Sequence, residues 1–213
     1  MCDYKQLLTG VNRLGIRLEE HAVERLLIYC SELRKWNRKI NLIARDTSAA
    51  EIMEKHFLDS LILLPLLDRH GSEGAHLLDV GSGAGFPGLV LAAVRPELCV
   101  TLLEPRQKRT AFLRHIARTL KLTNVSVREE RLEPSKALPE AFTFITSRAV
   151  AAPDIFLPLI EQTAGPETLV ILMLAAEERQ TWNVDRWQTV DSLKCSLPFS
   201  GHPRLLTALR KQP

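Results

Sequence analysis

Cysteine is scarce in this sequence of 213 residues and follows no pattern. Cys2, Cys30, Cys99 and Cys195 include no C-x-x-C pair, so neither a zinc cluster nor a disulfide framework is indicated. Aromatic residues make up only 6%, while hydrophobic residues at 46% and charged residues at 25% are ordinary for a globular enzyme. Since a chain of this length can bury a large core without staples, we expect no metal site.

Long hydrophobic runs are also missing. The first thirty residues carry charges such as Asp3, Lys5 and Arg13 among their apolar positions, which the apolar region of a secretory signal would not tolerate. No apolar run is long enough to span a bilayer. We therefore expect a cytoplasmic protein without a membrane partner.

The net charge of +3 is too small to indicate nucleic acid, but the distribution of the charges is more informative. Two segments without any acidic residue, 34–45 and 106–121, carry five and six basic residues. Such stripes can neutralise phosphates, although a solvated helix face is an equal alternative. The basic residues are Arg34, Lys35, Arg38, Lys39 and Arg45 in the first segment, and Arg106, Lys108, Arg109, Arg114, Arg118 and Lys121 in the second.

The first seventy-odd residues have the periodicity of helices. Apolar residues recur at helical spacing from Tyr4 to Leu14, with Gly15 as a natural terminator. Longer apolar stripes predict a second helix over 20–41 and a third over 48–67. We expect residues 1–73 to form an N-terminal helical cap.

From residue 74 onward, short apolar runs alternate with helical segments, which indicates βαβ units and a parallel sheet. Two further strands, 189–197 and 205–209, are separated only by a turn, which favours an antiparallel pair at the sheet edge. We expect an α/β fold of the class I methyltransferase type, Rossmann-like, over 74–213, packed with the cap as one compact unit. A plain dinucleotide-binding sheet is the alternative. The five preceding runs are 77–80, 99–103, 125–127, 142–145 and 169–174.

A glycine-rich loop over 79–88, with sequence DVGSGAGFPG, follows the first of these strands. Glycines here allow positive φ and close approach of a ligand to the backbone. Glu104 ends the next strand about twenty residues later, where a carboxylate can accept hydrogen bonds from ribose hydroxyls. The G-x-G-x-G spacing places Phe86 where a dinucleotide loop needs its third glycine, so we favour S-adenosylmethionine over NAD and a methyltransferase over a dehydrogenase.

The residues after the fourth strand limit the type of methyltransferase. Thr146-Ser147-Arg148-Ala149 stands there, whereas a cytosine-C5 enzyme would present a cysteine and an adenine-N6 enzyme an Asn/Asp-Pro-Pro-aromatic tetrad. What remain are acceptors that need no activation by the protein. Guanine N7 is one, because its lone pair can attack without deprotonation, and such an enzyme works by orientation and desolvation.

Five motifs in order resemble the bacterial small-subunit ribosomal RNA methyltransferase G family, also called glucose-inhibited division protein B. The resemblance covers most of the chain and implies methylation of guanine N7 in the 530 loop of 16S rRNA, at guanine 527, with 16S rRNA or the small ribosomal subunit as partner. The motifs are Trp36-Asn37-Arg38-Lys39-Ile40-Asn41-Leu42, His56-Phe57-Leu58-Asp59-Ser60-Leu61, Asp79 to Gly88, Lys108-Arg109 with Phe112-Leu113, and Ser147-Arg148-Ala149-Val150.

Carried over by position, the resemblance implies a cofactor site. Leu132 has a buried core position as its alternative, and Glu133, which precedes Pro134, has a turn. Arg148 would meet the cofactor carboxylate or an RNA phosphate, and we also assign it to the catalytic site. The implied cofactor residues are Gly81, Gly83, Phe86, Glu104, Leu132, Glu133 and Arg148; the expected RNA-binding residues are Arg34, Lys35, Arg38, Lys39, Lys108 and Arg109.

Two pairs in the cap have open roles. Asn37 and Asn41, four apart on the predicted helix, either bind the flipped base, with Asn37 as a positioning residue, or fasten the cap to the sheet. His56 and Asp59 are more readily a structural hydrogen-bond pair than a catalytic one, because no nucleophile accompanies them.

The sequence also departs from the family pattern. The fifth strand runs into Leu174-Ala175-Ala176 where relatives have Leu-Lys-Gly, so a basic contact is missing unless Arg179 supplies it. Two alternatives therefore stay open: a methyltransferase acting on a small molecule or protein, and a non-catalytic RNA-binding factor that retains the cofactor.

Overall fold

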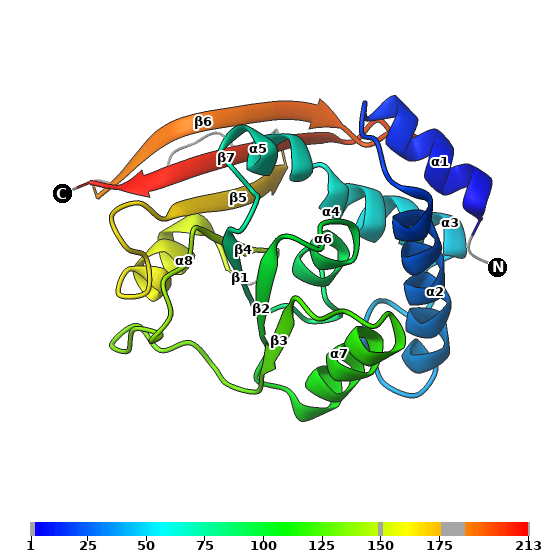
Figure 1. Ribbon diagram of the computed structural model, residues 1–213, viewed down its shortest axis with the longest axis horizontal. Coiled ribbons are helices and arrows are strands. Elements are labelled where there is room, and N and C mark those ends of the chain that lie inside the picture. The colour runs from blue at the N-terminus through cyan, green and yellow to red at the C-terminus, as the bar shows by residue number, and fades with distance from the viewer. Residues whose placement is uncertain (1–2, 149–150, 176–185, 213) are drawn as a thin grey trace.

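The computed structural model describes residues 3–148, 151–175 and 186–212. Within them, one mixed sheet has the strand order β3-β2-β1-β4-β5-β7-β6 (Figure 1). Strands β1 to β5 are parallel, and β7 pairs antiparallel with both β5 and β6. The predicted parallel sheet with a terminal antiparallel pair is therefore confirmed. The strands are β1 His76–Val80, β2 Cys99–Leu103, β3 Val125–Arg128, β4 Phe144–Ser147, β5 Leu169–Ala175, β6 Trp187–Ser196 and β7 Pro203–Lys211.

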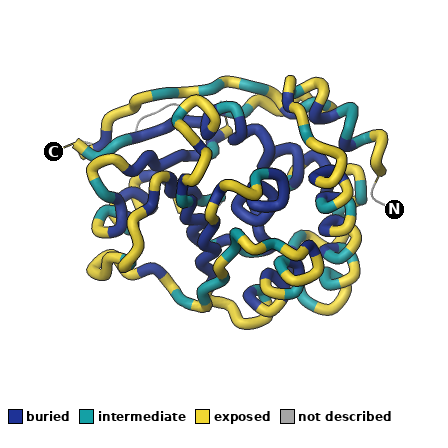
Figure 2. The backbone as a smooth tube through the Cα atoms, viewed as in Figure 1, coloured by how far each residue is buried: buried dark blue, intermediate teal, exposed yellow. Residues whose placement is uncertain are grey.

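Alternating side chains divide the core into two layers. Leu77 and Ile171 point to one face of the sheet, while their neighbours Leu78 and Val170 point to the other, as the two-residue period of a strand requires. The first face is covered by helices α6 (Gly88–Val94) and α7 (Gln107–Thr119). Helix α8 (Pro153–Ile160) covers the second face (Figures 1 and 2).

The helical cap packs on the α6–α7 side of the sheet. Helix α2 contacts α6 and α7, and α4 contacts α6, so that side chains of the cap and of the sheet share one hydrophobic cluster. The division of the chain at residue 73 stays a prediction. The cap elements are α1 Tyr4–Arg13, α2 Glu20–Asn37, α3 Ala49–Ile52, the π-helical segment η1 Met53–Leu58, α4 Asp59–Leu61 and α5 Leu64–Arg69.

The first helix ends as predicted, since α1 stops at Arg13 and Gly15 has φ +67°. The predicted end of the second helix at residue 41 was wrong. Helix α2 ends at Asn37, because the Asn37 Oδ1 accepts the N–H groups of Leu42 at 2.9 Å and Ile43 at 3.0 Å. A side chain that captures backbone donors further along the chain competes with helix continuation.

The third predicted helix is present but irregular. Ser48 caps it with a capping box to Glu51, and the helix then widens into η1, where the Asp59 N–H reaches back to the Glu54 carbonyl. The expected alternation also fails once, because residues 129–143, all described, hold turns and no helix between β3 and β4.

The turn between β6 and β7 is fastened to the cap by a buried carboxylate. Glu54 Oε1 accepts the N–H groups of Phe199 and Ser200, both at 2.7 Å, and Glu54 is only 7% exposed. Charge-assisted hydrogen bonds of this kind are the stronger ones in proteins. The far end of the chain is thereby tied to the segment that carries η1.

Two absences concern only the described residues. No helix there is long and apolar enough to cross a membrane, and no three metal-ligating side chains gather there. Cys99 and Cys195 are free.

Candidate functional site

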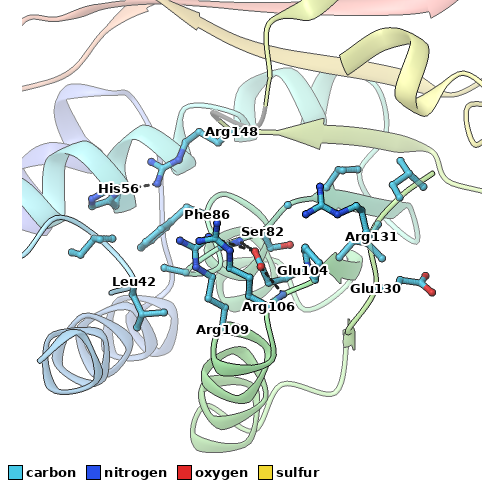
Figure 3. A pocket seen from close by; sticks show the side chains of 18 of the residues that line it. Leu42, His56, Ser82, Phe86, Glu104, Arg106, Arg109, Glu130, Arg131 and Arg148 are labelled. Carbon is cyan, nitrogen blue, oxygen red and sulfur yellow. Dashed lines mark hydrogen bonds and ion pairs between the residues drawn. The ribbon is translucent and has the colours of Figure 1, made fainter. Parts of the chain in front are cut away.

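A cavity of about 750 Å³ opens at the carboxyl ends of the central strands. It lies where the strand order reverses between β1 and β4, the place where open α/β sheets bind ligands. One wall comes from the sheet and the glycine loop, and the other from the cap segment 42–47 with Lys55 and His56 (Figure 3). This volume is typical of small-molecule sites.

The glycines of the loop serve two purposes. Gly81 and Gly83 line the cavity with φ of +69° and +57°, conformations that favour glycine. A Cβ on Gly83 would project toward Arg109, with Nη1 at 3.7 Å. Gly85 and Gly88 pack inward instead, and a Cβ on Gly88 would lie 2.7 Å from Leu102 Cδ2. Only the first two glycines therefore present backbone to a ligand.

Glu104 holds the loop and faces the cavity. Its Oε2 accepts the Gly83 N–H and its Oε1 the Arg106 N–H, each at 2.9 Å. Arg109 Nη1 lies 3.7 Å from Oε2. Since an ionised carboxylate has about four acceptor positions, this side chain retains capacity for ligand hydroxyls, as the sequence predicts.

Asp79, at the foot of the loop, is a fully buried carboxyl. Its Oδ2 accepts the Gly88 N–H at 2.9 Å, whereas Oδ1 is buried without a hydrogen-bond partner among the described residues. Burial raises the pKa of Asp79 to about 7, although the Gly88 N–H and the charge of Arg148 act in the opposite direction. An unpartnered buried carboxylate oxygen is costly, which favours the protonated form of this carboxyl.

Phe86 connects the loop to the cap. Its ring stacks on Tyr29, with centroids 5.6 Å apart, and on His56, with centroids 4.9 Å apart. The Tyr29 hydroxyl, fully buried, donates to the Ala84 carbonyl of the loop. Sequence analysis missed Tyr29, although it lies three residues after Leu26 and four before Leu33 on the apolar face of α2.

Arg148, just beyond β4, is held by the cap. Nη1 donates to the Lys55 carbonyl at 2.9 Å and lies 3.4 Å from Asp59 Oδ2, and Nη2 lies 2.8 Å from His56 Nδ1. The guanidinium also stands over the Phe86 ring, 4.9 Å from its centroid. The anion expected beside Arg148 is therefore supplied by the chain itself, as the Asp59 carboxylate. Arg148 nevertheless lines the cavity.

This network decides the state of His56. The predicted hydrogen bond between His56 and Asp59 was wrong, because Arg148 lies between the two side chains and contacts both. Asp59 Oδ1 also accepts a hydrogen bond from Arg204 Nε on β7 at 2.7 Å. Burial lowers the pKa of His56 to about 3, assisted by the positive charges of Arg148 and Lys55. The ring is therefore neutral under ordinary conditions.

Leu132 and Glu133, both predicted to hold the cofactor, differ in whether they reach the cavity wall. Leu132 lines the cavity and is 6% exposed, but Glu133 is exposed and its carbonyl accepts the Lys136 N–H in a turn. Asn37 lies at a neighbouring pocket of about 330 Å³, and Asn41 accepts from Arg45, so the two asparagines share no helix face. Asn37 binds the loop that follows α2 within the cap and does not fasten the cap to the sheet, and its role toward a base stays a prediction.

The predicted RNA-binding residues divide into four groups. Arg109 lines the cavity, while Arg34 and Arg38 line the neighbouring pocket with Arg45. Lys39 and Lys108 are exposed, and Lys35 is paired with Glu32. Sequence analysis did not assign three further cations to the site, and all three line the cavity: Lys55, Arg106 and Arg131.

Comparison with known proteins identifies the family. A family model described as rRNA small subunit methyltransferase G matches residues 22–202. The chain belongs to the rRNA small subunit methyltransferase G family. Ribosomal RNA small subunit methyltransferase G from Desulfotalea psychrophila is 45% identical over 97% of this chain and 98% of its own length. The protein of that name from Syntrophotalea carbinolica is 35% identical over 98% and 97%.

Solved structures support the fold. A mutant of MtNAS in complex with S-adenosylmethionine has a TM-score of 0.62 at 16% identity, covering 89% of this chain and 75% of that one. M. jannaschii TYW2 in complex with AdoMet has a TM-score of 0.52 at 13% identity, covering 70% and 76%. The predicted family and the class I methyltransferase fold are confirmed. Of the residues that the sequence analysis singles out at the end of the fifth strand, Ala175 is the exposed last residue of β5, whereas Ala176 and Arg179 lie outside the described residues.

Proposed function

We propose that this chain transfers a methyl group from S-adenosylmethionine to N7 of a guanine in 16S rRNA, guanine 527 of the 530 loop. The observation that carries this proposal is the buried Glu104 carboxylate, which faces the cavity beside the exposed backbone of Gly83. Family membership supplies the class of acceptor. The cytoplasm, where ribosomes assemble, is the expected location.

The residues present fit this cofactor. Glu104 would accept the ribose hydroxyls, Gly81 and Gly83 would let the backbone approach the ligand, and Leu132 would cover the adenine ring. When bound, the cofactor supplies a methyl group on a sulfonium, which is a good leaving group.

The chain itself contributes orientation and exclusion of water. Phe86, His56 and Arg148 form a wall fixed by stacking and by hydrogen bonds, so a planar base entering from the cap side meets a rigid surface. No general base is required, because N7 of guanine attacks through a free lone pair. Pre-organised positioning of this kind is sufficient to lower a barrier substantially.

The cations at the mouth suit an RNA backbone. Lys55, Arg106 and Arg131 open onto the cavity, and Arg38 and Arg45 line the adjacent pocket. Each contact of a cation with a phosphate makes binding sensitive to salt. We propose that the RNA crosses the cap from the pocket of Arg38 toward the cavity.

The proposal is tested by methyl transfer from labelled S-adenosylmethionine to small subunits and to naked 16S rRNA, both from a strain that lacks the modification. Label in N7-methylguanine at position 527 is expected in at least one substrate. Cofactor binding with no label in either would contradict the proposal and favour a non-catalytic factor.

Charge reversal separates RNA from smaller acceptors. Arg38→Glu is expected to lower kcat/KM on the RNA substrate, while Arg118→Glu, the same change on an exposed part of α7 outside the pockets, leaves it nearly unchanged. Equal activity of both variants would favour a small-molecule or protein methyltransferase.

A further inference from the structure

The two ring nitrogens of His56 meet different surroundings. Nδ1 lies 2.8 Å from Arg148 Nη2, and a guanidinium has donors only. Nδ1 must therefore accept, which it can do only when it carries no proton. The neutral ring then carries its proton on Nε2.

Burial and charge keep His56 in this state. The pKa of His56 is lowered to about 3, first by burial and then by the charges of Arg148 and Lys55. A second proton would turn the His56 ring into a cation in contact with the Arg148 guanidinium, which donates to Nδ1. Nε2–H is thus a neutral donor at the pH at which the protein works.

The His56 ring is fixed in the cavity wall. The His56 ring stacks on Phe86 at an interplanar angle of 20°, and the residue lines the cavity. Figure 3 shows His56 on the cap side with its bond to Arg148, across the cavity from Glu104. Within the part of the chain that the structure describes, Nε2 has no hydrogen-bond partner.

Guanine offers O6 and N7 as neighbouring acceptors on one edge. A forked donor such as a free arginine would engage both and occupy the lone pair that must attack. The fork of Arg148 is already committed to Lys55, Asp59 and His56. A single donor can hold O6 and leave N7 open.

We infer that the His56 Nε2–H donates to O6 of the acceptor guanine and so determines the specificity for this base. The inference rests on the proposed function. Adenine has an amino donor in place of O6, so two donors would face each other and adenine would be rejected.

The test is a cycle of two enzymes and two substrates. His56→Asn keeps an acceptor for Arg148 but has no donor at the Nε2 position, and the substrates are reconstituted particles with guanine or 2-aminopurine, which lacks O6, at position 527. On guanine, kcat/KM of His56→Asn is expected to fall about tenfold or more, the value of one hydrogen bond at the reacting base. On 2-aminopurine the two enzymes should differ by less than about threefold.

Three outcomes would overturn the inference. Equal losses on both substrates indicate a merely structural role. A weaker cofactor affinity of His56→Asn by the same factor, measured by calorimetry, assigns the contacted oxygen to the cofactor. An Nδ1-protonated tautomer in ¹⁵N NMR spectra of the unmodified protein contradicts the donor directly, whether or not the variant folds.

Further results separate this inference from the proposed function. His56→Gln, whose amide N–H can reach the Nε2 position, is expected to recover most of the activity on guanine; failure to recover, with the fold intact by thermal unfolding, counts against the donor. If the unmodified enzyme transfers no methyl group to guanine N7, the proposed function fails instead.

Discussion

Replacing His56 by asparagine is expected to remove part of the acid sensitivity of folding. The ordinary pKa of 6.5 applies to the unfolded chain, and the folded value is about 3. Because the unfolded chain takes up the proton first, His56 costs stability as the pH falls below 6.5, and this cost stops growing only near pH 3. Between about pH 7.5 and about pH 5, the loss from this one group is about 2 kcal/mol.

The measurement is urea unfolding of the unmodified protein and His56→Asn at both pH values. Asp79 acts in the opposite direction, since its pKa is raised to about 7 and its contribution improves as the pH falls, but it is present in both proteins and cancels in the difference. The stability of the variant relative to the unmodified protein should rise by about 2 kcal/mol on acidification. A relative stability that changes by less than about 0.5 kcal/mol would show that the ring is not held neutral by burial and by the charges of Arg148 and Lys55.

The remaining predictions concern packing, pairing and cofactor affinity. Gly85 has φ +91° and no room for a Cβ, so Gly85→Ala should lower the free energy of unfolding by about 2–4 kcal/mol. Gly201 has φ +70° and open space around it, so Gly201→Ala should lower the free energy of unfolding by only about 1 kcal/mol. Equal losses for the two variants in urea unfolding would contradict the close packing at Gly85. Asp59→Asn leaves two partly buried arginines without their shared carboxylate and should cost about 3 kcal/mol; a loss under about 1 kcal/mol in thermal unfolding would count against that network. Glu104→Gln should weaken S-adenosylmethionine binding about tenfold or more in calorimetry, while the same change at Glu133, which lies in an exposed turn, should leave it unchanged.

The strands of the sheet could be predicted closely, because each is a short apolar run that can be recognised in the local sequence. The run Cys99–Leu103 has the bounds that were predicted, and each of the others differs by one or two residues at one or both ends. Glycine spacing and an acid at the end of the second strand locate a ligand site without further knowledge, because both requirements come from backbone geometry.

The end of α2 could not be read from periodicity. Ile40 continues the apolar stripe, yet the helix stops at Asn37, because two backbone donors beyond it bind the Asn37 side chain. That competition depends on where the following loop lies. The same reason explains why Asn37 and Asn41 were placed together on one face.

The basic segment 106–121 shows a second limit. A run of like charges in the sequence is distributed around a helix at about 100° per residue. Arg106 and Arg109 line the cavity, whereas Arg114 pairs with Glu129, and Arg118 lies outside the pockets described. The charge of this segment can be predicted from the sequence, but the cations that face the site cannot.

The partners of Arg148 were hidden for a different reason. The anion that pairs with Arg148 is the carboxylate of Asp59, which lies on a helix 89 residues earlier in the chain. Only the packing of the cap on the sheet brings these residues together, and no local pattern records it. Arg148 was therefore predicted to contact an anionic ligand, whereas much of its hydrogen-bonding capacity is used by groups of the chain itself.

The ring of Phe86 couples the two walls of the cavity, one formed by the sheet and the glycine loop and the other by the cap. Phe86 directly follows Gly85, whose close contact fixes the loop against Tyr29 of the cap, and the same ring stacks on His56. A shift of the cap that moved His56 would have to break this stack or carry the glycine loop with it. Because a near-attack geometry tolerates little displacement, the proposed methyl transfer requires the cap to keep its position on the glycine loop, so a loop that binds an adenosine would not by itself be sufficient for the reaction.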